Sequence, residues 1–367
     1  MIDPPADKPQ PSPPPAAPKA VLLRATAQEV VGSTTRVAGL SVIERSIKQI
    51  DRLGYMIVVA SDGSCPLPKY LPASVVVRKV PKPDDLVALR REMPGVVEIP
   101  ANLVRASSRT LEGGLRVNDE ASRKRAEDAI FAELMRGRQG FVARYLNRPV
   151  SLFITRHLLC HLPVTPGQVC VAAALVGLCG AVLVATGSYA IMVWGFFLAH
   201  LQAVLDGCDR ELAGVRLQET HFRQRLDMML DESLDIAIFA ALGVGFFRGT
   251  GVGHYLAAGL AAAAMHIFYD AVLLGEIRRQ GESENRLEVK WRLAGIRSIK
   301  TRLEQRSNNL VRTLVTMGRR DFFIFAFLIY ALVGRPRLAL VHAPLVGFGL
   351  LVVAAVQVIW HLRGSPE

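Results

Sequence analysis

The sequence predicts an α-helical integral membrane domain with six transmembrane helices, preceded by a small α/β domain. Hydrophobic residues make up 51% of the 367 residues, which is high for a soluble protein. The excess lies in the second half, where apolar segments reach the length that a bilayer requires. The first half instead alternates short apolar runs with a segment of helical periodicity. Two regions of different class are therefore expected in one chain.

Composition also limits the classes of function. The net charge of +12 is compatible with nucleic acid or with the cytoplasmic face of a membrane. The basic residues gather beside the apolar segments, which favours membrane lipids and an anionic nucleotide over nucleic acid. The five cysteines show no paired spacing, so the sequence predicts neither a disulfide framework nor a zinc site.

Residues 1–19 are rich in proline and alanine, and we expect a disordered or polyproline-II tail there. They lack the apolar core of a signal peptide. A solvated tether is the expected role, with a docking motif as the alternative.

Residues 20–114 are expected to form the small α/β domain. Strands that alternate with helices imply parallel pairing in a sheet. Gly54 is expected to close the first helix, because glycine is favoured after a helix end. The expected strands are 21–25, Tyr55–Ala60, 74–80 and Val96–Pro100, and the expected helices are Leu40–Leu53 and Asp84–Glu92.

The run RVAGLSVIERSIKQIDRLGYMIVVASDG, at 36–63, resembles the first helix and second strand of sugar-nucleotide-type nucleotidyltransferases. That family holds a triphosphate on a glycine-rich loop and Mg²⁺ on a pair of aspartates. The segment before the helix, QEVVGSTTRVAG, has no such loop, and VVEIPAN offers only Glu98. We therefore expect a degenerate nucleotidyltransferase-like domain with a docking or regulatory role.

Residues 115–162 are expected to form a basic, amphipathic juxtamembrane segment. From Arg123 to Arg156 there are eight lysines and arginines against three acids. This pattern suits a helix on an anionic leaflet, with a solvated linker as the alternative. The expected apolar anchors are Ile130, Leu134, Phe141, Tyr145 and Leu146.

Residues 163–367 contain six apolar segments of membrane-spanning length. They are 168–186, 190–207, 230–247, 255–274, 322–333 (extended backward through 310–317) and 345–362. Between the fourth and fifth, Glu276–Arg320 holds twelve basic residues and five glutamates. The positive-inside rule then places both termini and the aspartates described next in the cytoplasm. We expect an integral protein of a bacterial inner membrane.

Five aspartates flank the turn between the second and third predicted spans. Asp206 and Asp209 end one apolar run, and Asp227, Asp231 and Asp235 begin the next. Three- and four-residue spacings put side chains on one helical face, so two antiparallel helices would direct both sets toward each other. Such carboxylates repel unless a cation joins them, and oxygen ligands favour Mg²⁺ or Mn²⁺. The alternative is that they cap helices and solvate the turn.

The spacing of these residues also resembles the signature of the CDP-alcohol phosphotransferases, D-x2-D-G-x2-A-R-x8-G-x3-D-x3-D. The positions in register are Asp206, Asp209, Ala213, Asp227 and Asp231. Three positions depart from it, namely Arg210 and Arg223 in place of glycines and Gly214 in place of arginine. The segments LNRPVS, PVTPGQV and GRRDFF resemble the same family. In the last of these, Arg319 and Arg320 could meet a phosphate or anchor the span.

The resemblance implies a transferase that binds a CDP-alcohol or CDP-lipid donor, releases CMP and joins the phosphate to an alcohol acceptor. It implies a metal site for Mg²⁺ (or Mn²⁺) on Asp206, Asp209, Asp227 and Asp231. Asp231 would also be the catalytic base. Ala213 would admit the nucleotide to the helix surface, and Arg210 would either crowd it or pair with its phosphate.

The order of the two domains resembles the bifunctional inositol-phosphate cytidylyltransferase/di-myo-inositol-phosphate phosphate synthase arrangement. That resemblance implies a polyol-phosphate acceptor such as inositol phosphate, or a head group of phospholipid biosynthesis, with membrane lipids around the site. A homodimer is in keeping with the family. Two alternatives remain open, a non-catalytic membrane protein that retains the aspartates and an ion or proton carrier.

Overall fold

This computed structural model describes residues 20–106, 111, 113–136, 140–280 and 319–362. The chain divides into two compact units, Met1–Glu133 and Leu134–Glu367, and each is described by itself. The expected tail at 1–19 and nearly all of the expected basic loop lie outside the described residues.

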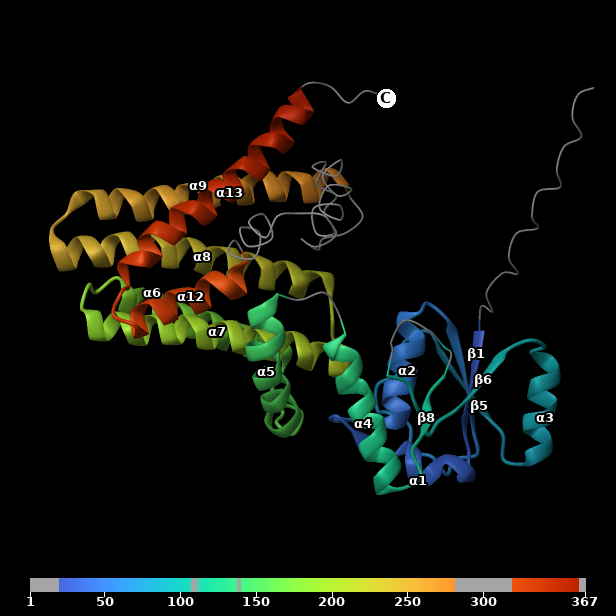
Figure 1. The fold of residues 1–367 in the computed structure, drawn as a ribbon. Helices are drawn as coiled ribbons and strands as arrows, with labels where there is room; N and C mark the ends of the chain where they lie inside the picture. Colours follow the sequence, from blue (N-terminus) through green and yellow to red (C-terminus); the bar gives the residue numbers. More distant parts are fainter. Residues whose placement is uncertain (1–19, 107–110, 112, 137–139, 281–318, 363–367) are drawn as a thin grey trace, which may run out of the picture. The chain divides into compact units, whose positions relative to one another are not determined.

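The first unit contains a four-stranded parallel sheet, as the alternation of strands and helices predicts. Its strands are β1 (Ala20–Ala25), β4 (Met56–Ser61), β5 (Val75–Lys79) and β6 (Val97–Pro100). They lie in the order β5-β4-β1-β6, and Val21 of β1 pairs with Ile57 on one side and Val97 on the other. Helices α2 (Val42–Arg52) and α3 (Pro83–Glu92) cover opposite faces (Figure 1). The prediction of a small parallel α/β domain is confirmed.

Successive side chains of β1 point to opposite faces of the sheet, so this strand contributes to two hydrophobic cores. Val21 and Leu23 point to the face where Ile47 of α2 packs, whereas Leu22 points to the face where Leu89 of α3 packs. All of these side chains are buried, as expected for the strands of a sheet covered on both faces. Gly54 follows α2 with a φ of 78°, a left-handed conformation that glycine adopts without steric cost.

Glu98, the single acid where a nucleotidyltransferase would hold its metal, is already paired. Arg90 donates to both of its carboxylate oxygens at 2.8 Å, and Arg24 donates to Oε1 at 3.1 Å. The hydrogen bonds from Arg90 hold the pKa of Glu98 below its usual range. A carboxylate with these partners is not an open metal ligand.

Smaller elements complete this part of the chain, namely η1 (Ala27–Glu29), α1 (Val30–Ser33), β2 (Arg36–Val37), β3 (Leu40–Ser41), β7 (Leu103–Val104), β8 (Leu115–Arg116) and α4 (Glu120–Met135).

The second unit is helical. Its long helices are α6 (Pro166–Val184), α7 (Tyr189–Arg216), α8 (His221–Thr250), α9 (Gly253–Gln280), α12 (Arg320–Leu332) and α13 (Arg337–Leu362). Helix α6 packs along α7, α8 along α9, and α13 against α9, while α12 lies against α7 (Figure 1). Their shared core includes Phe196, Phe239 and Phe327.

Four of these helices are long and apolar enough to cross a membrane, which fits a membrane domain. They are α6, α7, α9 and α13 over Arg337–Ile359. The third predicted span lies on α8 and the fifth on α12, and neither helix meets both conditions over the described residues. Helix α8 is long but polar in its first half, and α12 has only 13 described residues. Six spans are therefore not confirmed, and the backward extension at 310–317 lies outside the described residues.

The last part of the expected juxtamembrane segment forms one irregular helix from η2 (Ala143–Asn147) through α5 (Arg148–Ile154) to η3 (Thr155–Leu159). Its polar face is the buried one, because Ser151 and Thr155 donate to the buried carboxylate of Glu211 on α7 at 2.6 and 3.0 Å. Its apolar side chains Phe141, Tyr145 and Phe153 are exposed instead, as expected for a helix at a lipid surface. Ile130 on α4 is buried, so the expectation that it is an apolar anchor was wrong.

Two glycines let α8 and α9 approach at backbone distance. A Cβ added to Gly259 would lie 2.5 Å from the Cα of Gly243, and small residues are typical of such close helix contacts in membranes. We expect Gly259→Ala to lower the free energy of unfolding by about 1–3 kcal/mol, the usual cost of overpacking. Gly275→Ala on the same helix is the control, because its added Cβ meets nothing within 4 Å. Equal thermal stability of the two variants in detergent would contradict this packing.

Candidate metal centre

The five aspartates lie on α7 and α8, which a tight turn at residues 217–220 joins. Leu217 ends α7 in a left-handed conformation (φ 53°), and Thr220 begins α8 by accepting a hydrogen bond from the backbone of Arg223 at 3.2 Å. Because the two helices run antiparallel from this turn, the last turns of α7 face the first turns of α8.

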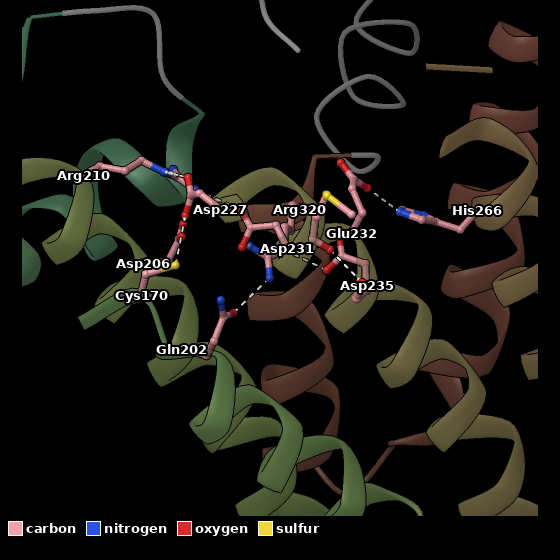
Figure 2. Close-up of polar contacts among 12 residues, drawn as sticks. Cys170, Gln202, Asp206, Arg210, Asp227, Asp231, Glu232, Asp235, His266 and Arg320 are labelled. Carbon is pink, nitrogen blue, oxygen red and sulfur yellow. Dashed lines mark hydrogen bonds and ion pairs between the residues drawn. The ribbon is translucent and has the colours of Figure 1, made fainter. Parts of the chain in front are cut away.

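The structure brings the predicted metal ligands together in two overlapping groups. Asp206, Asp227 and Asp231 each offer an oxygen within 4.8 Å of the others. Cys170 of α6, Asp209 and Asp227 offer a second set within the same distance. Asp227 belongs to both groups, and its Oδ1 lies 3.9 Å from the Cys170 sulfur (Figure 2). The four predicted metal ligands therefore lie in one contiguous site.

A guanidinium lies across the first group. Arg210 donates from Nε to Asp227 at 3.0 Å and from Nη2 to Asp231 at 2.9 Å, and Nη2 also bonds to Asp206 (Figure 2). The three carboxylates are 9–15% exposed, whereas the Arg210 side chain is 51% exposed. Arg210 thus joins the carboxylates from the solvent side.

A second arginine pairs with Asp209. Arg223 donates from Nη1 to Oδ2 of Asp209 at 2.6 Å, and the Asp209 side chain is fully buried. The other oxygen of Asp209, Oδ1, is buried and has no hydrogen-bond partner among the residues that the structure describes. A buried carboxylate oxygen with no partner is costly, so this atom indicates a ligand that would complete the site.

A third arginine, Arg320 at the start of α12, forms ion pairs with two aspartates of α8. It donates from Nη1 to Asp231 at 2.6 Å and from Nε to Asp235 at 2.7 Å. Gln202 of α7 accepts from its Nη2 at 3.0 Å (Figure 2). The sequence suggested that Arg320 contacts a phosphate or anchors the span. In the structure Arg320 is the ion-pair partner of two aspartates.

The charge and the donor atoms fit a divalent cation. Five aspartates meet three guanidiniums, which leaves a formal charge of −2. Carboxylate oxygens are the ligands that Mg²⁺ and Mn²⁺ prefer, and no described residue bonds to the Oδ1 of Asp209. The sulfur of Cys170 is the one soft donor among the grouped atoms, whereas the grouped carboxylate oxygens suit both Mg²⁺ and Mn²⁺.

The structure also shows which residues sequence reasoning missed. Cys170 comes from a helix distant in the sequence, and no spacing rule connects it to the aspartates. His266 of α9 lies 2.7 Å from the buried Glu232. Glu232, Asp235 and His266 form a third group of ligating atoms within 4.8 Å of one another. Ala213 is fully buried, so its role beside a nucleotide stays a prediction.

Part of the chain is similar to a known protein. A segment of 92 residues is 39% identical to a protein of Aquifex aeolicus (strain VF5) described as a bifunctional IPC transferase and DIPP synthase. The segment is 25% of this chain and 20% of that protein. No protein-family model matches the chain. The likeness supports a related transferase family, and the activities of the whole relative do not transfer with so short a segment.

Proposed function

We propose that this protein is a membrane-embedded transferase that moves a substituted phosphate group from a CDP-alcohol or CDP-lipid to an alcohol acceptor, with release of CMP. The observation that carries the proposal is the convergence of Asp206, Asp227 and Asp231 within 4.8 Å where two helices meet. The partial likeness to an IPC transferase and DIPP synthase supports the same class of reaction.

Transfer from a diphosphate requires that the negative charge of the leaving nucleotide be neutralised. A divalent cation, when bound, supplies this neutralisation by polarising the phosphoryl oxygens. The predicted ligands Asp206, Asp209, Asp227 and Asp231 are the carboxylates from which its ligands would come. The two arginines that replace the glycines of the signature, Arg210 and Arg223, add positive charge directly beside these ligands.

Asp231 is the proposed general base for the attacking hydroxyl. Its Oδ1 accepts from Arg320 and its Oδ2 from Arg210. A carboxylate has about four lone-pair sites, so these two bonds leave room for a hydroxyl donor. Arg320 and Arg210 thereby fix the orientation of the carboxylate that would take the proton.

The partial likeness supports the acceptor class that we propose. We propose a polyol phosphate or a phospholipid head group, in a bacterial inner membrane with the site on the cytoplasmic side. The exposed aromatic side chains of the juxtamembrane helix support a position at the lipid surface. We also propose that the protein forms a homodimer.

The test is release of CMP by the purified full-length protein in lipid nanodiscs, with a panel of CDP-alcohols and with Mg²⁺ or Mn²⁺. We expect Asp231→Asn to lower the rate about 10²–10⁴-fold, the usual contribution of a general base. Asp84→Asn, an exposed aspartate on α3, is the matched control and should leave the rate unchanged. Equal rates for the two variants would remove Asp231 from the chemistry.

A second candidate is a non-catalytic protein that retains the aspartates. The ion pairs of Arg210 and Arg223 favour it, because both guanidiniums lie on carboxylates that a catalytic cation would use. This candidate predicts that no CDP-alcohol releases CMP with either cation, although the aspartates still bind Mn²⁺.

A further inference from the structure

We propose that Arg210 takes the place of one divalent cation, so that the protein binds a single ion at Cys170, Asp209 and Asp227. The assignment of a cation site rests on the proposed function. The number of ions that the site binds is a separate question, which depends on the residues of this chain. Arg210 stands where the CDP-alcohol phosphotransferase signature has a glycine. This replacement places a positive charge beside the aspartates.

The hydrogen bonds of Arg210 to the aspartates leave two of its five donors available. A guanidinium has five N–H groups, and Arg210 uses the one on Nε and the two on Nη2 for the three aspartates. Its Nη1 makes no hydrogen bond to the residues that the structure describes, and the side chain is 51% exposed. The free Nη1 can therefore donate to a phosphate oxygen while the rest of the guanidinium holds the carboxylates. A bridging metal ion would join carboxylates to phosphate in the same way.

A cation could enter the first group only by displacing Arg210. The guanidinium is tethered to α7, four residues after Asp206 and one after Asp209, so its local concentration at the aspartates is very high. Displacement would break three charge-assisted hydrogen bonds at once. The first group therefore stays occupied by the guanidinium.

The second group keeps an open position. Asp209 Oδ1 is buried with no partner in the described part of the chain, and Asp227 and the Cys170 sulfur lie within 4.8 Å of an Asp209 ligand atom. The formal charge of −2 that remains with Arg210 in place equals the charge of one divalent ion. Removal of Arg210 would change this charge to −3 and free the oxygens of Asp206 and Asp231 for a second ion.

The experiment counts Mn²⁺ bound to the full-length protein in nanodiscs, by the loss of the free-ion EPR signal on titration. We expect one ion for the natural protein and two for Arg210→Gly. Arg248→Ala, at the far end of α8, should still bind one. Asp209→Asn should bind none, because it removes a ligand of the open group and leaves Arg210 in place.

Binding of CDP in EDTA tests the phosphate contact without any metal. We expect Arg210→Gly to weaken it at least tenfold and Arg248→Ala to leave it unchanged. Two ions in the natural protein would overturn the proposal, and so would one ion in both the natural protein and Arg210→Gly. If Arg210→Gly misfolds, Arg210→Gln replaces it, and the expected count is again two ions. Failure of CMP release with one Mn²⁺ bound would count against the proposed function only.

Discussion

Asp227→Asn is expected to abolish binding of Mn²⁺ and to lower CMP release by about 10³-fold or more. Asp227 is the one aspartate that belongs to both groups of ligand atoms, so no arrangement of a cation at this site avoids it. Charge stabilisation by a bound cation is worth several kcal/mol in phosphoryl transfer, and each 1.36 kcal/mol is tenfold in rate. The loss differs in cause from that of Asp231→Asn, which leaves Cys170, Asp209 and Asp227 in place to bind the cation.

The measurement pairs Mn²⁺ titration with CMP release on the same samples. Asp84→Asn again serves as the matched aspartate variant, because its side chain is exposed on α3. A monodisperse Asp227→Asn protein that binds Mn²⁺ as tightly as the natural chain would show that the cation lies elsewhere. Asparagine preserves the size of the side chain, so loss of binding with retained thermal stability would exclude misfolding as the cause.

The convergence of the aspartates could be predicted because it depends on local geometry alone. Spacings of three and four residues on each helix, together with a short connection, leave few ways to arrange Asp206, Asp227 and Asp231. The same holds for the sheet of the first unit, where buried apolar runs alternate with helices. In both cases the information lies within a short stretch of sequence.

The partners of the aspartates could not be predicted in this way. Arg320 follows the site by 85 residues and Cys170 precedes it on another helix, so only the packing of α6 and α12 against α7 and α8 brings them near. Arg210 was visible as a departure from a glycine, but its three hydrogen bonds depend on the rotamer of a long side chain. The six spans were expected from hydropathy, and α8 fails that criterion because its first half carries the polar residues of the site.

Arg320→Ala is expected to destabilise the membrane unit by about 3–5 kcal/mol, the usual cost of removing one partner from a buried ion pair. Arg320 bonds to Asp231, Asp235 and Gln202, and the Asp235 side chain is only 3% exposed. Without the guanidinium, the Asp235 carboxylate would be buried with no cation beside it. Arg319→Ala is the control, because Arg319 is 46% exposed and an exposed pair is worth about 1 kcal/mol or less.

The double variant Arg320→Ala/Asp235→Asn separates the loss of a charge pair from the loss of packing. If the cost arises from the uncompensated carboxylate, neutralising Asp235 should restore a large part of the stability, and the two changes will be strongly non-additive in denaturant titrations in mixed micelles. If the cost arises from the contacts of the arginine stem, the double variant will be at least as unstable as Arg320→Ala. The first outcome would identify Arg320 as the residue that allows α8 to bury an aspartate below the metal site, and the second would limit it to a packing role at the start of α12.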